Sequence, residues 1–251
     1  MSQIRVERQG PVRNVIIARP EKRNALTDEM MVEIRELFTA PPPADERVTV
    51  IRGEGPSFCA GLELSTGGVD PAAAQLIETM FDAVQRYPLP TVARVQDAAI
   101  AGGCELALHC DFTVAALDAR FAMPLAQIGV ATTWFLTKKI MEAAGPVIGR
   151  EFLLLGDPLS GDRLAALGVV ARAVAETELD AEVARLTERL AANAPLSLKA
   201  MKGLILRQMS VFDLPERGEA AALADAVWSS EDALEGVRAR VEKRKPSFKG
   251  K

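Results

Sequence analysis

The sequence predicts an α/β fold with a helical C-terminal region, on three observations. Short β-rich runs alternate with amphipathic helical stretches in the N-terminal part of the chain. Beyond about residue 135, nearly every stretch has helical periodicity instead. The chain has 251 residues, 49% of them hydrophobic, which is enough for the core of one domain with a small helical extension.

The first predicted elements are a β-hairpin and a helix. Residues 4–8 alternate with period two, residues 12–18 are β-rich, and Gln9-Gly10-Pro11 forms the turn between them. Thr27 is a typical N-cap, and the acidic residues after it suit the first turn of an amphipathic helix that runs to Phe38. Three consecutive prolines then end this helix.

The next stretches continue the alternation of strands and helices. Residues 48–51 and 91–95 are typical of buried strands. Between them we expect a helix over residues 71–87, which is stopped by the prolines that follow it. A second helix follows a Gly-Gly turn over residues 103–110, and residues 112–115 return as a strand. This order predicts a parallel sheet or a coil of ββα turns.

The C-terminal part is predicted to be almost entirely helical. Ser160 is a typical N-cap and Gly168 a typical stop for one short helix in this part. The expected helices cover residues 135–144, 147–155, 162–167, 179–193, 196–208, 216–227 and 232–245, and a strand-like run at 169–174 interrupts them. We therefore expect an α/β core over residues 1–190 and a helical region over residues 191–251.

Composition excludes several classes of function. The net charge of −4 and the pI of about 5.3 argue against a nucleic-acid-binding surface. No segment approaches the ~20 apolar residues of a membrane span, and the N-terminus has no apolar signal region, so we expect a cytoplasmic protein. Three cysteines in no metal-type spacing and a single histidine predict reduced thiols and no metal site.

The run from Ala99 to Ala107 is the most informative feature for function. Two adjacent glycines, Gly102 and Gly103, let the backbone approach a ligand closely, and the carboxylate of Glu105 follows on the first turn of a helix. The unpaired N–H groups of such a turn can polarise a carbonyl oxygen beside an acid or base. The alternative is a tight turn with a solvated glutamate.

Five motifs in order make the chain resemble the crotonase (enoyl-CoA hydratase/isomerase) family. They are Arg19-Pro20-Glu21-Lys22-Arg23-Asn24-Ala25-Leu26, Phe58-Cys59-Ala60-Gly61-Leu62-Glu63-Leu64, Pro90-Thr91-Val92-Ala93, Ala101-Gly102-Gly103-Cys104-Glu105-Leu106-Ala107 with Cys110-Asp111, and Val241-Glu242-Lys243-Arg244-Lys245-Pro246-Ser247-Phe248. The resemblance runs nearly end to end. It implies a crotonase-like spiral of ββα turns with a helical C-terminal trimerisation region.

The resemblance also implies a substrate and a set of site residues. The substrate is a coenzyme A thioester, whose carbonyl oxygen is held by the backbone N–H groups of Leu62 and Gly102, while Glu105 is a catalytic acid or base. No cofactor is implied beyond the coenzyme A of the substrate. The implied substrate-binding residues are Lys22, Arg23, Ala25, Ala60, Gly61, Leu125, Trp134 and Lys243, of which the three basic ones lie where the family contacts the nucleotide or its phosphates.

One position departs from the family pattern. The family places a second catalytic glutamate twenty residues after the first, and this chain has Leu125 there. Hydration of an enoyl thioester usually shares its work between two carboxylates, whereas isomerisation, decarboxylation and C–C cleavage need only one acid/base group and the oxyanion pocket. His109, on the same helical face as Glu105, and Asp70 are the candidates to replace the missing group.

The sequence therefore predicts an acyl-CoA-processing enzyme that self-associates as a trimer or a dimer of trimers. Hydratase is the default activity, with isomerase or another acyl-CoA lyase as the alternative. A non-catalytic acyl-CoA-binding protein on the same fold is a third possibility, since binding alone does not need the lost carboxylate.

Overall fold

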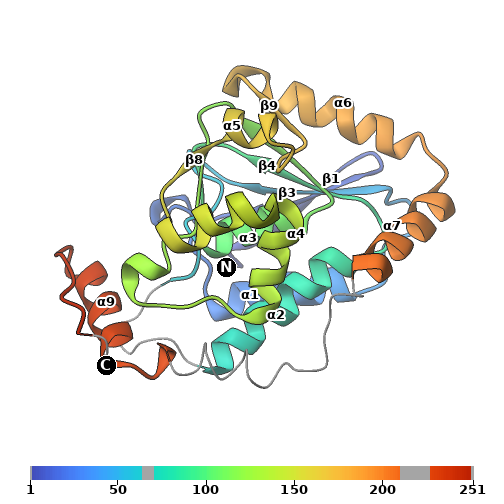
Figure 1. Ribbon diagram of the computed structural model, residues 1–251. Helices are drawn as coiled ribbons and strands as arrows, with labels where there is room; N and C mark the ends of the chain where they lie inside the picture. The colour runs from blue at the N-terminus through green and yellow to red at the C-terminus, as the bar shows by residue number, and fades with distance from the viewer. Residues whose placement is uncertain (1, 64–70, 210–226, 250–251) are drawn as a thin grey trace.

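A mainly parallel sheet forms the centre of the computed structural model, which describes residues 2–63, 71–209 and 227–249 (Figure 1). Its order is β1-β2-β3-β4-β6-β9. The strands are β1 (Ile4–Gln9), β2 (Val12–Ile17), β3 (Val48–Gly53), β4 (Thr91–Val95), β6 (Phe112–Ala116) and β9 (Arg172–Val174). Within this sheet, only β1 and β2 pair antiparallel, and their pairing confirms the predicted hairpin.

A second, three-stranded sheet was not predicted. It consists of β5 (Ala98–Ile100), β7 (Arg120–Ala122) and β8 (Leu159–Ser160), in that order. Strands of two or three residues are too short to show a period-two pattern. In the sequence, two of the three strands cannot be distinguished from the turns next to them. The second sheet matters for function because β5 leads directly into the Gly-Gly turn.

Helices cover both faces of the larger sheet (Figure 1). They are α1 (Asp28–Thr39), α2 (Pro71–Arg86), α3 (Gly102–His109), α4 (Trp134–Arg150), α5 (Gly161–Ala166), α6 (Leu179–Ala191), α7 (Pro195–Met209) and α9 (Glu231–Val241). In Figure 1, α6 lies above this sheet, and α1 to α4 lie below it. The predicted caps are confirmed: the Thr27 hydroxyl accepts from the Met30 N–H, and the Ser160 hydroxyl accepts from the Arg163 N–H.

Several boundaries differ from the prediction for local reasons. The two helices expected around residues 135–155 are one kinked helix followed by a π-turn, because Gly145 (φ +68°) bends α4 before Pro146. Helix α9 stops at Val241 rather than at residue 245, since Lys243 adopts a left-handed conformation (φ +55°). The helix predicted at 216–227 lies, except for its last residue, outside the described part of the chain.

The core lies between the sheets and the helices α1, α2 and α3. Its largest fully buried side chains include Tyr87, Phe58, Phe81 and Phe121. Among the helices that the structure describes, none has the length and apolar character needed to cross a membrane.

Candidate active site

Backbone pairing brings the first, second and fourth sequence motifs together. Residues 58–63 lie in the middle of this arrangement. On one side, the Ala60 N–H donates to the Arg23 carbonyl at 2.9 Å. On the other side, the Cys59 N–H donates to the Ala98 carbonyl at 3.0 Å. Segments that are far apart in the sequence therefore converge at the start of α3.

Asn24 holds the first motif in place. It is fully buried and has a left-handed backbone (φ +57°). Its side-chain oxygen accepts from the Arg19 N–H at 2.9 Å, and its amide donates to the carbonyls of Ser57 at 2.7 Å and Glu54 at 2.9 Å. Sequence reasoning did not single out this positioning role, although Asn24 is part of the quoted motif.

The two glycine turns touch each other. Gly61 has φ +94°, and a Cβ there would lie 2.8 Å from the Ile100 carbonyl oxygen, so only glycine fits. Ala101, at the N-cap of α3, has φ +48° and ψ −114°, a strained conformation for a residue with a side chain. Strain of this kind persists only where the surrounding structure enforces it, which marks this turn as a constrained part of the site.

Gly102 and Gly103 differ in how closely the rest of the protein packs against them. A Cβ on Gly103 would lie 2.2 Å from the Cys59 carbonyl oxygen, so α3 can pack this closely only with glycine. A Cβ on Gly102 would make ordinary contacts, the nearest at 3.5 Å to the Leu62 side chain. The protein itself therefore tolerates a larger residue at position 102.

Glu105 is a buried carboxyl group on the first turn of α3. Its residue is 1% exposed, and neither carboxyl oxygen has a hydrogen-bond partner within the described chain. Burial raises the pKa of Glu105 well above its usual range, and the Lys139 cation opposes this only in part. The Nδ1 atom of His109 lies 3.6 Å from Glu105 Oε2. Glu105 is therefore held as a neutral acid over a wider pH range than an exposed glutamate.

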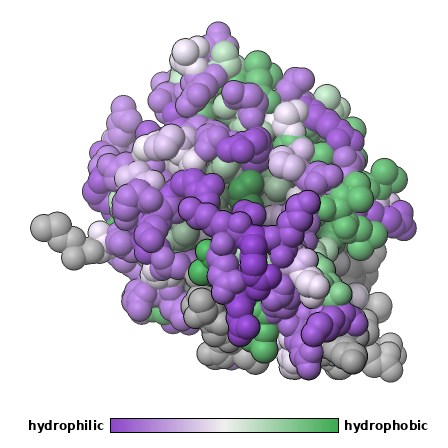
Figure 2. All heavy atoms as spheres, turned by 90° about the vertical axis from the view of Figure 1, so that its left-hand side faces the viewer, coloured by the Kyte–Doolittle hydropathy of each residue, from purple (hydrophilic) through white to green (hydrophobic). Residues whose placement is uncertain are grey.

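A cavity of about 590 Å³, which we call the acyl cavity, contains Glu105, Leu62 and Gly102 in its lining. Next to these residues its wall is apolar, from Ile77, Phe81, Leu125, Val130 and Leu136. Basic residues also line it: Lys22, Arg23, Arg240 and Arg244. Figure 2 looks onto the face that carries α9, where hydrophilic side chains surround a recess with hydrophobic atoms in it. The cavity thus combines an apolar wall with a set of cations.

Most of the residues predicted for the site line this one cavity: Lys22, Arg23, Ala25, Ala60, Leu62, Gly102, Glu105 and Leu125. Gly61 forms the turn beside them. Trp134 and Lys243 are not among the lining residues, and Arg240 and Arg244, which the prediction omitted, line the cavity on either side of Lys243 in sequence. Arg244 belongs to the C-terminal motif and Arg240 directly precedes it, and this basic stretch was the available clue.

Neither residue predicted to replace the second glutamate is found in the lining of the acyl cavity. Asp70 lies outside the described residues. His109 contacts Glu105 but does not line the acyl cavity, so it cannot touch a substrate there. Thr132, by contrast, lines the cavity and has a buried hydroxyl without a hydrogen-bond partner among the described residues. Leu125 itself adds only apolar surface to the wall.

Comparison with known proteins gives the family to which the chain belongs. The family model described as enoyl-CoA hydratase/isomerase matches residues 7–251. The chain therefore belongs to the enoyl-CoA hydratase/isomerase family, within the crotonase superfamily. It is 30% identical to 2,3-dehydroadipyl-CoA hydratase of Escherichia coli K12 over the full length of both chains.

Solved structures show the same fold. An enoyl-CoA hydratase from Mycobacterium avium subsp. paratuberculosis superposes with a TM-score of 0.85 at 25% identity, over 99% of each chain. Methylmalonyl-CoA decarboxylase in complex with 2-nitronate-propionyl-CoA superposes with a TM-score of 0.92 at 23% identity, over 100% of this chain and 99% of the other. The crotonase-like α/β fold predicted from the sequence is thereby confirmed, and so is an acyl-CoA enzyme of the hydratase/isomerase family.

Proposed function

We propose that this enzyme forms an enolate from an acyl-CoA thioester, with Glu105 moving a proton at the substrate carbon next to the carbonyl group. The observation that carries the proposal is a buried carboxyl group without hydrogen-bond partners that lines the same cavity as Gly102. A neutral acid in an apolar site is poised for proton transfer near neutral pH. A protein that only binds acyl-CoA has no use for such a group.

The backbone N–H groups of Leu62 and Gly102 are the proposed donors to the thioester oxygen. Their turns are in contact, and neither N–H has a hydrogen-bond acceptor among the described residues. Negative charge develops on this oxygen as the enolate forms, and prearranged donors stabilise it best where water is excluded. Removing one such donor costs other enzymes about 10²–10³ in rate.

The basic residues of the cavity are the proposed contacts for coenzyme A. Lys22 and Arg23 come from the first motif, and Arg240 and Arg244 come from α9 and the residues just after it. Several cations around one cavity suit the phosphate groups of the nucleotide. Of these, Arg244 also binds the carboxylates of Glu235 and Glu242. The apolar wall around Leu125 would then receive the acyl chain. No cofactor other than the coenzyme A of the substrate enters this scheme.

Glu105 is the buried carboxyl group in the lining of the acyl cavity, whereas the other carboxylate there, Glu63, is half-exposed and binds Arg19 at 2.9 Å. One buried acid/base group favours reactions such as double-bond isomerisation, decarboxylation or C–C cleavage of an acyl-CoA. Hydration is the second candidate, supported by the 30% identity to a full-length hydratase. In that case the Thr132 hydroxyl, which lines the cavity and has no hydrogen-bond partner among the described residues, is the proposed group to bind the attacking water. The reaction would then run with one carboxylate instead of two.

Self-association into a trimer or a dimer of trimers is also proposed. One face of α7 exposes large apolar side chains, with Leu196, Met201, Leu204 and Ile205 between 52% and 80% exposed. An apolar stripe of this kind on a helix is typical of a surface that another chain covers. Light scattering should give a mass of three or six chains, and a clean 27.0 kDa monomer at working concentration would contradict this proposal.

The test of the function has two readouts on the same protein. Acyl-CoAs of different chain lengths should raise the melting temperature, because a ligand that binds the native state stabilises it. The bound thioester should then exchange its α-hydrogen with D2O, as measured by mass spectrometry. If no acyl-CoA shifts the melting temperature, the substrate class is wrong; if they bind without exchange, the role of Glu105 is wrong.

A further inference from the structure

The acyl cavity has a charged side and an apolar side. Its cations come from the first sequence motif and from α9 with the residues just after it. The lining residues that α2 and α4 contribute are Ile77, Phe81 and Leu136, all apolar and none more than 8% exposed. Ile77 and Phe81 are four residues apart on α2 and therefore lie on one face of that helix. A chain of methylene groups fits the side of the cavity that α2 and α4 form.

Packing fixes the Phe81 ring on this apolar side. The residue is fully buried, and its ring stacks on the imidazole of His109 with the centroids 4.8 Å apart and 13° between the planes. The imidazole in turn stacks on Phe135, with the centroids 5.3 Å apart and 22° between the planes. The three rings come from α2, α3 and α4. Because protein interiors are close-packed, the Phe81 ring cannot move aside for a ligand without disturbing these helices.

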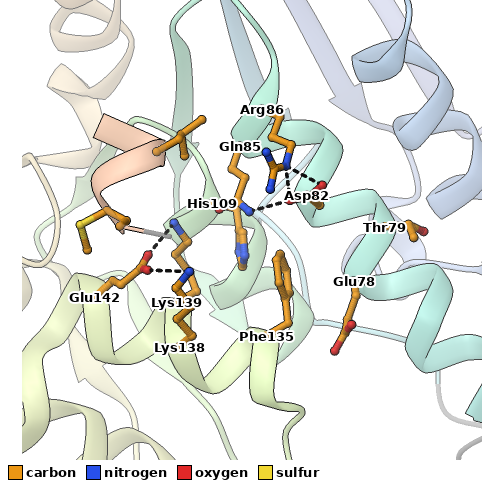
Figure 3. Close-up of a pocket in the computed structure, with 12 residues that line it drawn as sticks. Glu78, Thr79, Asp82, Gln85, Arg86, His109, Phe135, Lys138, Lys139 and Glu142 are labelled. Atoms are coloured by element: carbon orange, nitrogen blue, oxygen red, sulfur yellow. Dashed lines mark hydrogen bonds and ion pairs between the residues drawn. The ribbon is translucent and has the colours of Figure 1, made fainter. Parts of the chain in front are cut away.

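A second cavity, of about 270 Å³, lies on the other side of the stack and is lined by side chains of α2, α3, α4 and α7 (Figure 3). We call it the rear cavity. His109 and Phe135 belong to its lining, whereas Phe81 belongs to the lining of the acyl cavity. The two cavities share no lining residue. The Phe81 ring, with His109 behind it, therefore separates the acyl cavity from the rear cavity.

The rear cavity is lined mainly by charged and polar side chains, which Figure 3 shows around His109. On α4, Lys138 and Lys139 lie 3.5 Å and 3.3 Å from the carboxylate of Glu142. On α2, the guanidinium of Arg86 donates to Asp82 at 2.7 Å. An alkyl chain in this cavity would displace water from charged groups without replacing its hydrogen bonds, which is unfavourable. The rear cavity therefore does not suit an apolar acyl chain.

The distance from Glu105 to Phe81 limits the length of the chain. Oε2 of Glu105 lies 3.6 Å from Nδ1 of His109, and the imidazole centroid lies 4.8 Å from that of the Phe81 ring. With the size of the imidazole included, the Phe81 ring centre is at most about 10 Å from Oε2. A van der Waals contact with the ring takes about 3.5–4 Å of this distance. With C–C bonds of about 1.5 Å, about four carbons fit beyond C2, the carbon next to the carbonyl group.

We propose that Phe81 determines the acyl specificity of this enzyme and restricts it to short acyl-CoA substrates, of about six carbons or fewer. The inference rests on the proposed function, because it places C2 of a bound acyl-CoA next to Glu105. The last carbon of a chain of this length contacts the Phe81 ring, and a longer chain has no apolar space to enter. Phe81 is thus a specificity-determining residue that contacts the end of the acyl group.

This limit predicts a break in the affinity for saturated acyl-CoAs of increasing length. Each methylene group that enters the apolar side of the cavity should raise the affinity about fourfold. Beyond about six carbons the affinity of the wild type should stop rising, because the fixed ring stack leaves the further carbons outside the apolar side.

Calorimetry with saturated acyl-CoAs from acetyl-CoA to decanoyl-CoA tests the limit in the wild type and in Phe81→Ala. Without the ring, the acyl cavity extends to the face of the His109 imidazole. We expect this variant to bind octanoyl-CoA at least about tenfold more tightly than hexanoyl-CoA, since two methylene groups enter the new space. The wild type should bind the two about equally. Phe81→Leu opens less space, should move the break in the same direction, and replaces Phe81→Ala if that variant does not fold.

Phe135→Ala is the matched control. It removes a ring of the same size from the same stack, but on the rear-cavity side of His109, so it should keep the break of the wild type. An unchanged break in the folded Phe81 variant, or a wild-type affinity that rises steadily to decanoyl-CoA, would overturn the inference and leave the proposed function in place. A break that moves equally in Phe135→Ala would also overturn it, because the limit would then depend on the whole stack. Failure of the wild type to bind any acyl-CoA would instead remove the proposed function, and the inference with it.

Discussion

Replacing Leu125 by glutamate restores the second carboxylate of the family pattern in the cavity that holds Glu105. Leu125 directly precedes the short helix η2 (Ala126–Ile128), and its side chain packs on the apolar wall. Its backbone is helical, with φ −66° and ψ −45°, so glutamate fits without strain. If hydration is the native reaction, the new carboxylate gives the attacking water an acceptor that the wild type lacks.

The size of the effect is limited by what surrounds the new group. Phe81 and Val130 line the same wall, and Glu105 already brings one carboxyl group into this cavity. Burying an uncompensated polar group costs about 1–3 kcal/mol in mutational experiments. For a chain of this length, about 2–4 °C per kcal/mol gives a loss of melting temperature of about 2–12 °C. Burial and the second carboxyl group also raise the pKa of the new glutamate, which keeps part of it protonated.

We therefore expect a gain in hydration of about tenfold, below the 10²–10⁴ that a well-placed acid/base group supplies. The assay follows the loss of the enoyl thioester absorbance of crotonyl-CoA, with Leu125→Gln as the matched variant that cannot titrate. Fast hydration by the wild type would refute the reasoning, because another group would already replace the second glutamate. A Leu125→Glu protein that binds acyl-CoA normally but gains nothing would mean that the cavity serves a reaction other than adding water.

Three further predictions test Glu105 and the glycine turn. Glu105→Gln should lower turnover by about 10²–10⁴, because an amide keeps the shape of the side chain but cannot exchange a proton. Its acyl-CoA affinity, measured by calorimetry, should stay within a few-fold of the wild type. Unchanged turnover would leave Glu105 without a catalytic role. The pH dependence of stability tests the raised pKa of Glu105. Above pH 4.5 the unfolded chain loses the Glu105 proton, whereas the folded protein keeps it up to its raised pKa. Between these two pH values, the free energy of unfolding of the wild type should fall relative to that of Glu105→Gln by about 1.4 kcal/mol per pH unit. Denaturation at several pH values measures this, and a constant difference would show that the carboxyl group is solvated. Gly103→Ala should lower the melting temperature strongly, because its Cβ would lie 2.2 Å from a carbonyl oxygen. Gly102→Ala should fold normally and bind acyl-CoA weakly. Equal melting temperatures of the two variants would contradict this prediction.

The sequence predicted the helix caps and the hairpin, because these depend on interactions between residues close together in the chain. Thr27 and Ser160 accept hydrogen bonds at the helix starts where their side chains led us to place caps. The hairpin of β1 and β2 follows from one turn between two short strand patterns. By contrast, the second sheet depends on pairing between strands of two or three residues from distant parts of the chain. No periodicity within such a strand can predict its partner.

In the candidate site, too, the local features could be predicted from the sequence and the long-range contacts could not. Two glycine turns and a first-turn glutamate could be recognised from their spacing, but their contact needed Gly61 to lie against Ile100, which is a long-range fact. The reason for Gly103 was also hidden, because the carbonyl that excludes a side chain belongs to Cys59. His109 was considered as a second group in the substrate cavity, since helical spacing places it beside Glu105. Spacing alone could not show that its side chain lies outside the lining of the acyl cavity.

Burial of Glu105 matters for the position where the family pattern has a second glutamate and this chain has Leu125. A second carboxylate in the acyl cavity would normally bind water next to Glu105, and that water can exchange protons with it. Leu125 is part of the apolar wall of this cavity, and burial raises the pKa of Glu105. A carboxyl group in such a wall is a good acid but has poor access to new protons.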